Sequence, residues 1–147
     1  MVLYTWYIKR KMKKVYEIKL DIYPCSIFIT KETDISKLST KFFFCRRDDV
    51  LIETPLTIEE IQRDVVDGVD AACIPVIDKK TNRVGILLIR VTDFDVSVLA
   101  HECVHIADYI FDYTGMNAES FAEGNEAYAY LLGHLFGKIQ KIIINGE

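Results

Sequence analysis

The hydrophobic positions of this 147-residue chain change their spacing along the sequence. In the first two thirds, apolar residues partly alternate with polar ones or form short runs rich in β-branched side chains, a pattern typical of strands. From residue 95 onward they recur every three or four residues, which is typical of helices that bury one face. Strands followed by long helices predict an α+β fold, with a small mixed or antiparallel sheet.

Three stretches in the N-terminal half suggest strands or short helices. Residues 14–30 partly alternate and are interrupted by Pro24, which predicts one or two strands with the proline at a bulge or an edge. Thr33–Leu38 predicts a short helical turn that directs Ile35 and Leu38 inward. Phe42–Phe44 predicts a buried strand or a hydrophobic plug.

The middle of the chain predicts a helix and a β-hairpin. Thr57–Glu60 has the form of a capping box, so we expect a helix from there to about Val66, ended by Gly68. Asp70–Ile77 and Arg83–Val91 are β-branched and flank a polar turn, which favours a hairpin. The second of these strands is apolar on both faces, so we place it inside the sheet or under the helices.

Two long helices are expected at the C-terminal end. The first spans Asp95–Asp112, with a Thr or Asp from residues 92–95 as its N-cap. A break follows at 114–117, and the capping box Ser120–Glu123 predicts the start of a second helix that extends to about Ile143. Apolar residues of the first helix that we expect in the core are Val96, Leu99, Val104, Ile106 and Ile110.

The first of these helices carries the sequence His101-Glu102-Cys103-Val104-His105. Two histidines four residues apart lie one above the other on a helix, so both imidazoles can bind one metal ion. Glu102 lies about 100° round the helix, beside the predicted ligands. This H-E-x-x-H pattern is that of zinc hydrolases, in which the glutamate is the general base. Cys103 points away from the histidine face and is interpreted as a core thiol.

A third ligand is expected from the second helix. In an antiparallel helix hairpin, residues equally far from the break lie side by side, and His105 and Glu126 are nearly symmetric about residues 115 and 116. Glu119 lies too close to the turn, and Glu123 is the reserve candidate. We therefore predict one Zn²⁺ per chain, held by both histidines and Glu126.

The motif, the twenty residues after it and Asn125-Glu126-Ala127 together resemble the gluzincin branch of zinc metallopeptidases. The resemblance covers about Leu99 to Gly133. It implies a zincin-like domain in which a sheet precedes the motif helix, and it implies Glu126 as the third zinc ligand. The chain departs from the family at position 130, where gluzincins often have Asp and this sequence has Tyr. Its size is similar to that of minimal gluzincins and of short phage- or prophage-encoded proteins of unassigned activity.

The function implied is peptide-bond hydrolysis by zinc-activated water, with Glu102 as general base. Residues predicted to orient a ligand or to stabilise the oxyanion are Asp108, Asp112, Tyr130 and His134, with Tyr109, Tyr113 and Tyr128 also near in sequence. For three of these residues a surface position is the alternative interpretation. Asp108 and Asp112 could belong to a solvated helix face, and His134 could be an ordinary surface histidine.

Two other interpretations stay open. The protein could be a non-catalytic binding or assembly protein stabilised by zinc, or it could bind no metal. A third variant is a latent peptidase whose C-terminal segment, Lys138–Glu147, blocks the site or packs on another subunit in a homodimer, although burial in its own core is the favoured role of that segment.

Composition sets the remaining expectations. The size predicts one domain over residues 1–147, with a metal-binding helix pair at 93–144. The net charge of −4 argues against a nucleic-acid partner, but residues 1–47 hold 11 Lys/Arg against 4 Asp/Glu. We interpret residues 1–14 as a basic N-terminal arm. The absence of an export signal or a membrane span and the scattered cysteines favour the cytoplasm, that of a bacterial host if the chain is phage-encoded.

Overall fold

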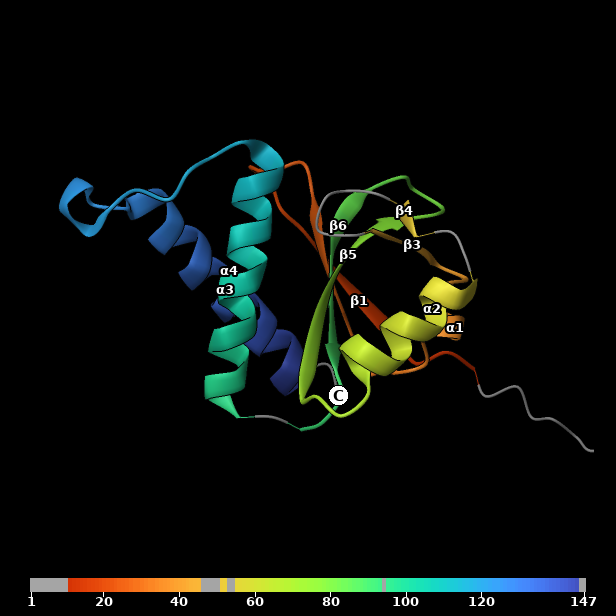
Figure 1. The fold of residues 1–147 in the computed structure, drawn as a ribbon. Coiled ribbons are helices and arrows are strands. Elements are labelled where there is room, and N and C mark those ends of the chain that lie inside the picture. The colour runs from red at the N-terminus through yellow and green to blue at the C-terminus, as the bar shows by residue number, and fades with distance from the viewer. Residues whose placement is uncertain (1–10, 46–50, 53–54, 94, 146–147) are drawn as a thin grey trace, which may run out of the picture.

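The computed structural model describes residues 11–45, 51–52, 55–93 and 95–145. Figure 1 shows the chain in three layers, with a twisted sheet between two groups of helices. Its elements, in chain order, are β1 (Val15–Lys19), β2 (Ser26–Thr30), α1 (Ile35–Leu38), β3 (Phe42–Cys45), β4 (Leu51–Ile52), α2 (Pro55–Ile61), the π-helical turn η1 (Gln62–Val66), β5 (Ala71–Asp78), β6 (Val84–Arg90), α3 (Val96–Thr114), the short 3₁₀ helix η2 (Phe121–Glu123) and α4 (Glu126–Asn145).

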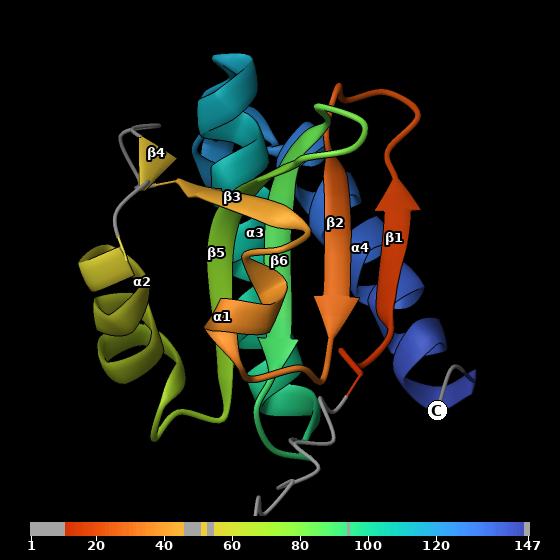
Figure 2. The same cartoon turned by 90° about the vertical axis from the view of Figure 1, so that its right-hand side faces the viewer.

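The described strands form one mixed sheet in the order β1-β2-β6-β5-β3-β4. Strands β2 and β6 run parallel, and the other neighbouring pairs are antiparallel. In Figure 2, β6 lies in the middle of the sheet, between β2 and β5. Six of its seven residues are buried, which confirms the expectation of a strand inside the sheet. The α+β class, the predicted hairpin of β5 and β6 and the two-strand reading of residues 14–30 are also confirmed.

Each face of the sheet has its own hydrophobic core. Alternation along the strands sends Ile86 and Leu88 of β6 toward α3 and α4, while Leu87 and Ile89 face α1 and α2. Helices α3 and α4 therefore cover one face together, and Figure 1 shows them on the side opposite α1 and α2. The C-terminal segment belongs to the first core, because Ile139 is fully buried and Ile142 packs against the cluster.

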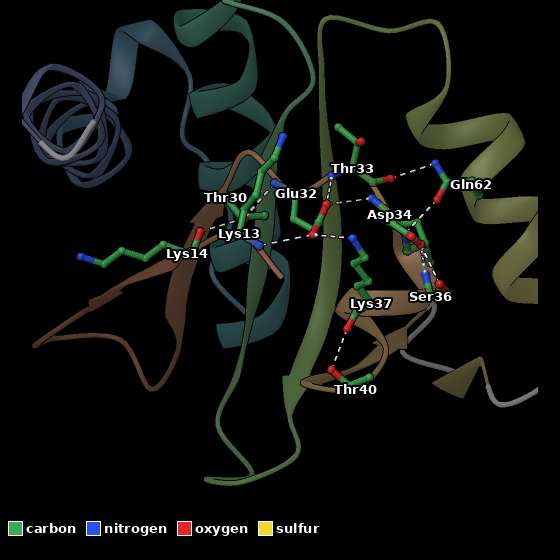
Figure 3. A network of polar contacts seen from close by, with 11 residues as sticks. Lys13, Lys14, Thr30, Glu32, Thr33, Asp34, Ser36, Lys37, Thr40 and Gln62 are labelled. Atoms are coloured by element: carbon green, nitrogen blue, oxygen red, sulfur yellow. Dashed lines mark hydrogen bonds and ion pairs between the residues drawn. The ribbon is translucent and has the colours of Figure 1, made fainter. Parts of the chain in front are cut away.

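A buried carboxylate fixes the segment between β2 and α1. Glu32 Oε1 accepts a hydrogen bond from the backbone amide of Lys13, and Oε2 accepts from the amides of Thr33 and Asp34 (Figure 3). The ammonium group of Lys37 lies 3.9 Å from Oε1. Gln62 then ties η1 to the same segment, since its side chain accepts from the Ile35 amide and donates to the Thr33 carbonyl. Ile35 and Leu38 of the resulting helical turn are buried, as predicted.

Some boundaries differ from the predicted ones. Helix α2 begins at Pro55, so Thr57 is its third residue and is not at the N-cap position. The Ser120–Glu123 capping box opens only η2, because Gly124 and Asn125 have positive φ angles of 91° and 40° and interrupt the helix. The long helix therefore starts at Glu126. In α3, Val96 and Val104 were expected in the core, but both are exposed.

The expectations for the basic N-terminal arm and for a membrane span concern the ends and the helices of the chain. Residues 1–10 of the predicted basic arm lie outside the described residues. None of the helices in the described ranges has both the length and the apolar character needed to cross a membrane.

The close packing of β2 against β6 gives the first prediction. A Cβ at Gly85 would clash with the carbonyl oxygen of Ser26 and would lie 2.8 Å from the Phe28 ring. Because Ser26 contributes backbone, the clash forces the parallel strands apart, and we expect Gly85→Ala to lower the free energy of unfolding by about 1–3 kcal/mol or more. Gly133→Ala is the matched control: open space surrounds Gly133 in α4, so it should raise stability by up to about 1 kcal/mol. Urea unfolding measures both, and equal effects would contradict this packing.

Candidate active site

The helix that carries the H-E-x-x-H sequence has well-defined ends. At its start, the Asp95 carboxylate accepts hydrogen bonds from the backbone amides of Ser97 and Val98, as predicted for an N-cap. At its end, Gly115 adopts a left-handed conformation with φ of 72°, and the next amide bonds to the Phe111 carbonyl. These caps fix where along the sheet each turn of α3 lies.

Helix α3 has a buried face and a face turned to a pocket. Leu99, Cys103, Ile106 and Ile110 are at most 4% exposed and pack on the sheet, which confirms Cys103 as a core thiol. The exposed residues His101, His105, Asp108 and Asp112 follow one another every three or four positions and form a polar stripe. Packing of the apolar face therefore sets the direction of the histidines.

The two imidazoles meet at their outer nitrogens. His101 Nε2 and His105 Nε2 lie 3.0 Å apart, and the ring planes are inclined by 77°. A hydrogen bond between them requires that at least one ring be neutral and offer a lone pair. A zinc ion bound about 2.0–2.1 Å from both Nε2 atoms at this separation would have an N–Zn–N angle of roughly 90–97°. The tetrahedral angle would be reached if the two Nε2 atoms moved apart by about 0.3–0.4 Å. The pair fits a single zinc ion.

The histidines open into a pocket between α3 and β5. Its volume is about 660 Å³, and a second pocket of about 340 Å³ shares Ala71, His101 and Glu102 with it. The larger pocket is lined by Ala71, Ala72, Cys73, Pro75, Ile86, His101, Glu102, His105, Asp108, Tyr109, Asp112 and Tyr113. Carboxylates, imidazoles and phenol rings therefore surround one solvent-accessible space.

Glu102 lies on the side of α3 that faces the sheet. Glu102 is only 7% exposed, yet it lines the pocket. The Cys73 thiol of β5 donates a hydrogen bond to Glu102 Oε2 over 3.0 Å. Burial, and then the negative charge of Glu102, raise the pKa of Cys73 well above its usual range. The thiol therefore stays protonated at neutral pH and serves as a donor.

Asp108 connects the site to α4. The hydroxyl of Tyr128 donates to Asp108 Oδ1 over 2.7 Å, and the Tyr128 ring packs edge-on against Phe111. Partial burial, together with this hydrogen bond and the nearby carboxylate charge, raises the pKa of Tyr128 to about 12. The Asp108 carboxylate is thus held at the edge of the pocket by the second helix.

The structure gathers some of the predicted residues and not others. His101, Glu102, His105, Asp108 and Asp112 line one pocket. Glu126, Tyr130 and His134 are exposed on α4 and are not part of its lining. Across the ranges that the structure describes, no three His, Cys, Asp or Glu residues come together as a metal-binding group.

The helix pair does not have the register that was expected. The α4 residue that reaches the polar stripe of α3 is Tyr128, at the level of Asp108, because residues 116–125 form a longer connection than a tight turn. The hairpin symmetry that placed Glu126 beside His105 is therefore wrong for this structure. Glu126 as a zinc ligand stays a prediction.

Two residues of the site were missed by the sequence analysis. Cys73 was considered only among the scattered cysteines, and Tyr128 only as one of several nearby tyrosines. A signal for Cys73 existed, since alternation along β5 puts positions 71, 73 and 75 on one face. The contact with Glu102 joins residues 29 positions apart, and no local pattern reports it.

Comparison with models of known protein families, with curated proteins and with solved structures gives no significant match.

The contact between Tyr128 and Asp108 gives the second prediction. Because the folded-state pKa of Tyr128 is raised to about 12, its hydroxyl bond stabilises the fold fully below pH ~10 and is lost as the pH rises toward 12. Tyr128→Phe should therefore have a lower free energy of unfolding than wild type at pH 8, and this difference should shrink above pH ~10. Denaturant unfolding from pH 7 to 11.5 measures this. Tyr130→Phe, at an exposed tyrosine outside the pocket, is the control, and a gap that stays constant over this range would contradict the assignment.

Proposed function

We propose that the protein is a zinc-dependent peptidase with a zincin-like active site. The observation that carries the proposal is the convergence of His101 Nε2 and His105 Nε2 to 3.0 Å beside the Glu102 carboxylate, in a pocket open to solvent. Two imidazoles from one helical face and an adjacent carboxylate are the part of a hydrolytic zinc site that the H-E-x-x-H sequence supplies, and a third protein ligand completes such a site.

Each residue of the pocket has a chemical role in this proposal. His101 and His105 would hold the ion, which when bound lowers the pKa of water and polarises a carbonyl group. Glu102 takes a proton from the attacking water and passes it to the leaving amine. Asp108 and Asp112 extend the polar stripe beyond His105 and, as carboxylates, can orient an imidazole through its second nitrogen.

A strand edge that no described strand pairs with supports a peptide as substrate. β3 pairs with β5 only at Val76–Asp78, and among the described strands none pairs with Ala71–Pro75 on the side away from β6. This edge lies against both pockets. An extended polypeptide can add to such an edge by backbone hydrogen bonds, which would align its peptide bonds along the histidines and Glu102.

The third ligand is proposed from the sequence pattern. Glu126 is the first residue of α4 and its side chain is exposed. Asp108 is the competing donor, because it lies three residues after His105 and lines the pocket. Zinc affinities of Glu126→Ala and Asp108→Asn distinguish the two.

The third prediction concerns metal content. Purified without a histidine tag, the full chain should bind about one zinc. His101→Ala and His105→Ala should each weaken binding by more than roughly 100-fold, since the loss of a direct ligand exceeds the effect of an outer one. Competition with a chromophoric chelator measures the affinities. His134→Ala removes an exposed histidine outside the pocket and is the matched control. Unchanged affinity in both active-site variants would refute the metal site.

The fourth prediction concerns the general base. Glu102→Gln removes the proton acceptor and keeps the shape, so we expect zinc content to persist while kcat on casein or a mixed peptide library falls by roughly 10²–10⁴-fold. Wild-type activity in this variant would exclude Glu102 as the base.

A binding or assembly protein that keeps the zinc for stability is the second candidate. Phe121 of η2 is 98% exposed and Tyr130 of α4 is 75% exposed, so large side chains project from both the α3–α4 connection and α4. A structural zinc site is normally closed by four protein ligands, whereas two imidazoles converge here. Zinc retained by wild type without turnover of any peptide would favour this candidate.

A further inference from the structure

The proposed general base occupies an unusual position for a carboxylate. Glu102 is 7% exposed and lies between α3 and the apolar face of the sheet. A charge at such a place loses most of its hydration, and the loss is tolerated when a hydrogen-bond donor faces it. Here that donor is the thiol of Cys73, at 3.0 Å from Oε2.

The strand around Cys73 determines the direction of its thiol. Ala71, Cys73 and Pro75 share one face of β5 and line the larger pocket. Ile74 and Ala72 are buried in the core on the other face, although Ala72 also borders the pocket. The sulfur also lies 4.0 Å from the Glu102 backbone carbonyl, so it is lodged against this one turn of α3. The contact follows from the packing of β5 on α3.

We propose that Cys73 is a positioning residue, whose thiol holds Oε2 of Glu102 so that the other carboxylate oxygen is presented to the pocket. This inference rests on the proposed function, because it assigns to Cys73 the orientation of that reaction's base. The thiol itself attacks nothing: burial and the adjacent carboxylate keep it protonated.

The consequence is a change in rate without a change in binding. Removing the donor frees the carboxylate to rotate, and misplacement of a reacting group by about 1 Å can cost on the order of 100-fold. Cys73→Ala should therefore lower kcat by roughly 10- to 100-fold, with KM and zinc content unchanged. Cys73→Ser restores a hydroxyl donor to the carboxylate and should return kcat to within roughly threefold of wild type.

The matched control is Cys25→Ala. Cys25 is a buried thiol of the core beneath α3 and α4, against which the partly buried Cys73 packs, but Cys25 does not line the pocket. Any loss of activity that comes only from removing a buried sulfur should appear in this variant too. Equal losses in Cys25→Ala and Cys73→Ala would overturn the positioning role.

A second readout needs neither metal nor turnover. Raman spectra of the metal-free full chain resolve the S–H stretch, and the band that disappears in Cys73→Ala belongs to this thiol. In Glu102→Gln that band should move to higher frequency, because an amide oxygen is a weaker acceptor than a carboxylate. An unmoved band overturns the contact and the inference with it.

The two proposals fail in different ways. Wild-type kcat in Cys73→Ala overturns the inference and leaves the peptidase standing. Zinc-loaded wild type that hydrolyses no peptide overturns the peptidase, and the positioning role falls with it, whatever the Raman band shows.

Discussion

The packing of α3 on the sheet is the constraint on which the site depends. Leu99, Cys103, Ile106 and Ile110 belong to the core between α3 and the sheet, and their burial fixes the rotation of the helix about its axis. With the rotation fixed, the one-turn spacing of His101 and His105 has a single outcome: both rings project from the same side and their Nε2 atoms meet. The caps at Asp95 and Gly115 fix the helix along its length.

The same packing explains why Glu102 is buried whereas His101 and His105 of the same motif are exposed. It lies between the histidine stripe and the buried face, so its carboxylate is directed toward β5. A buried carboxylate without a donor would destabilise the fold, because its desolvation would not be offset. The Cys73 thiol of β5 supplies that donor. Stability and the proposed chemistry thus depend on one contact.

Much of the local structure could be predicted from the sequence, because local patterns determine it. The hairpin of β5 and β6, the Asp95 cap and the turn at Ile35–Leu38 follow from turn residues, a capping residue and apolar spacing. Val96 and Val104 were misplaced because α3 is apolar on more than one side, and only its contact with the sheet selects the buried arc. The parallel pairing of β2 with β6 joins distant segments and leaves no local signal.

In the candidate site, too, features set by local geometry could be predicted and features set by contacts between distant elements could not. The convergence of His101 and His105 could be predicted, since helix geometry alone produces it. The register of α4 could not, because it depends on η2 and on the positive φ angles of Gly124 and Asn125, which make the connection longer than a simple hairpin turn. Cys73 and Tyr128 belong to the site only through packing between elements.

X-ray absorption at the zinc edge tests the central claim most directly. For the zinc-loaded full chain, the account predicts imidazole scattering from two histidines at about 2.0–2.1 Å, completed by oxygen donors and without sulfur. A first shell containing sulfur, or one without two imidazoles, would contradict the placement of the metal between His101 and His105.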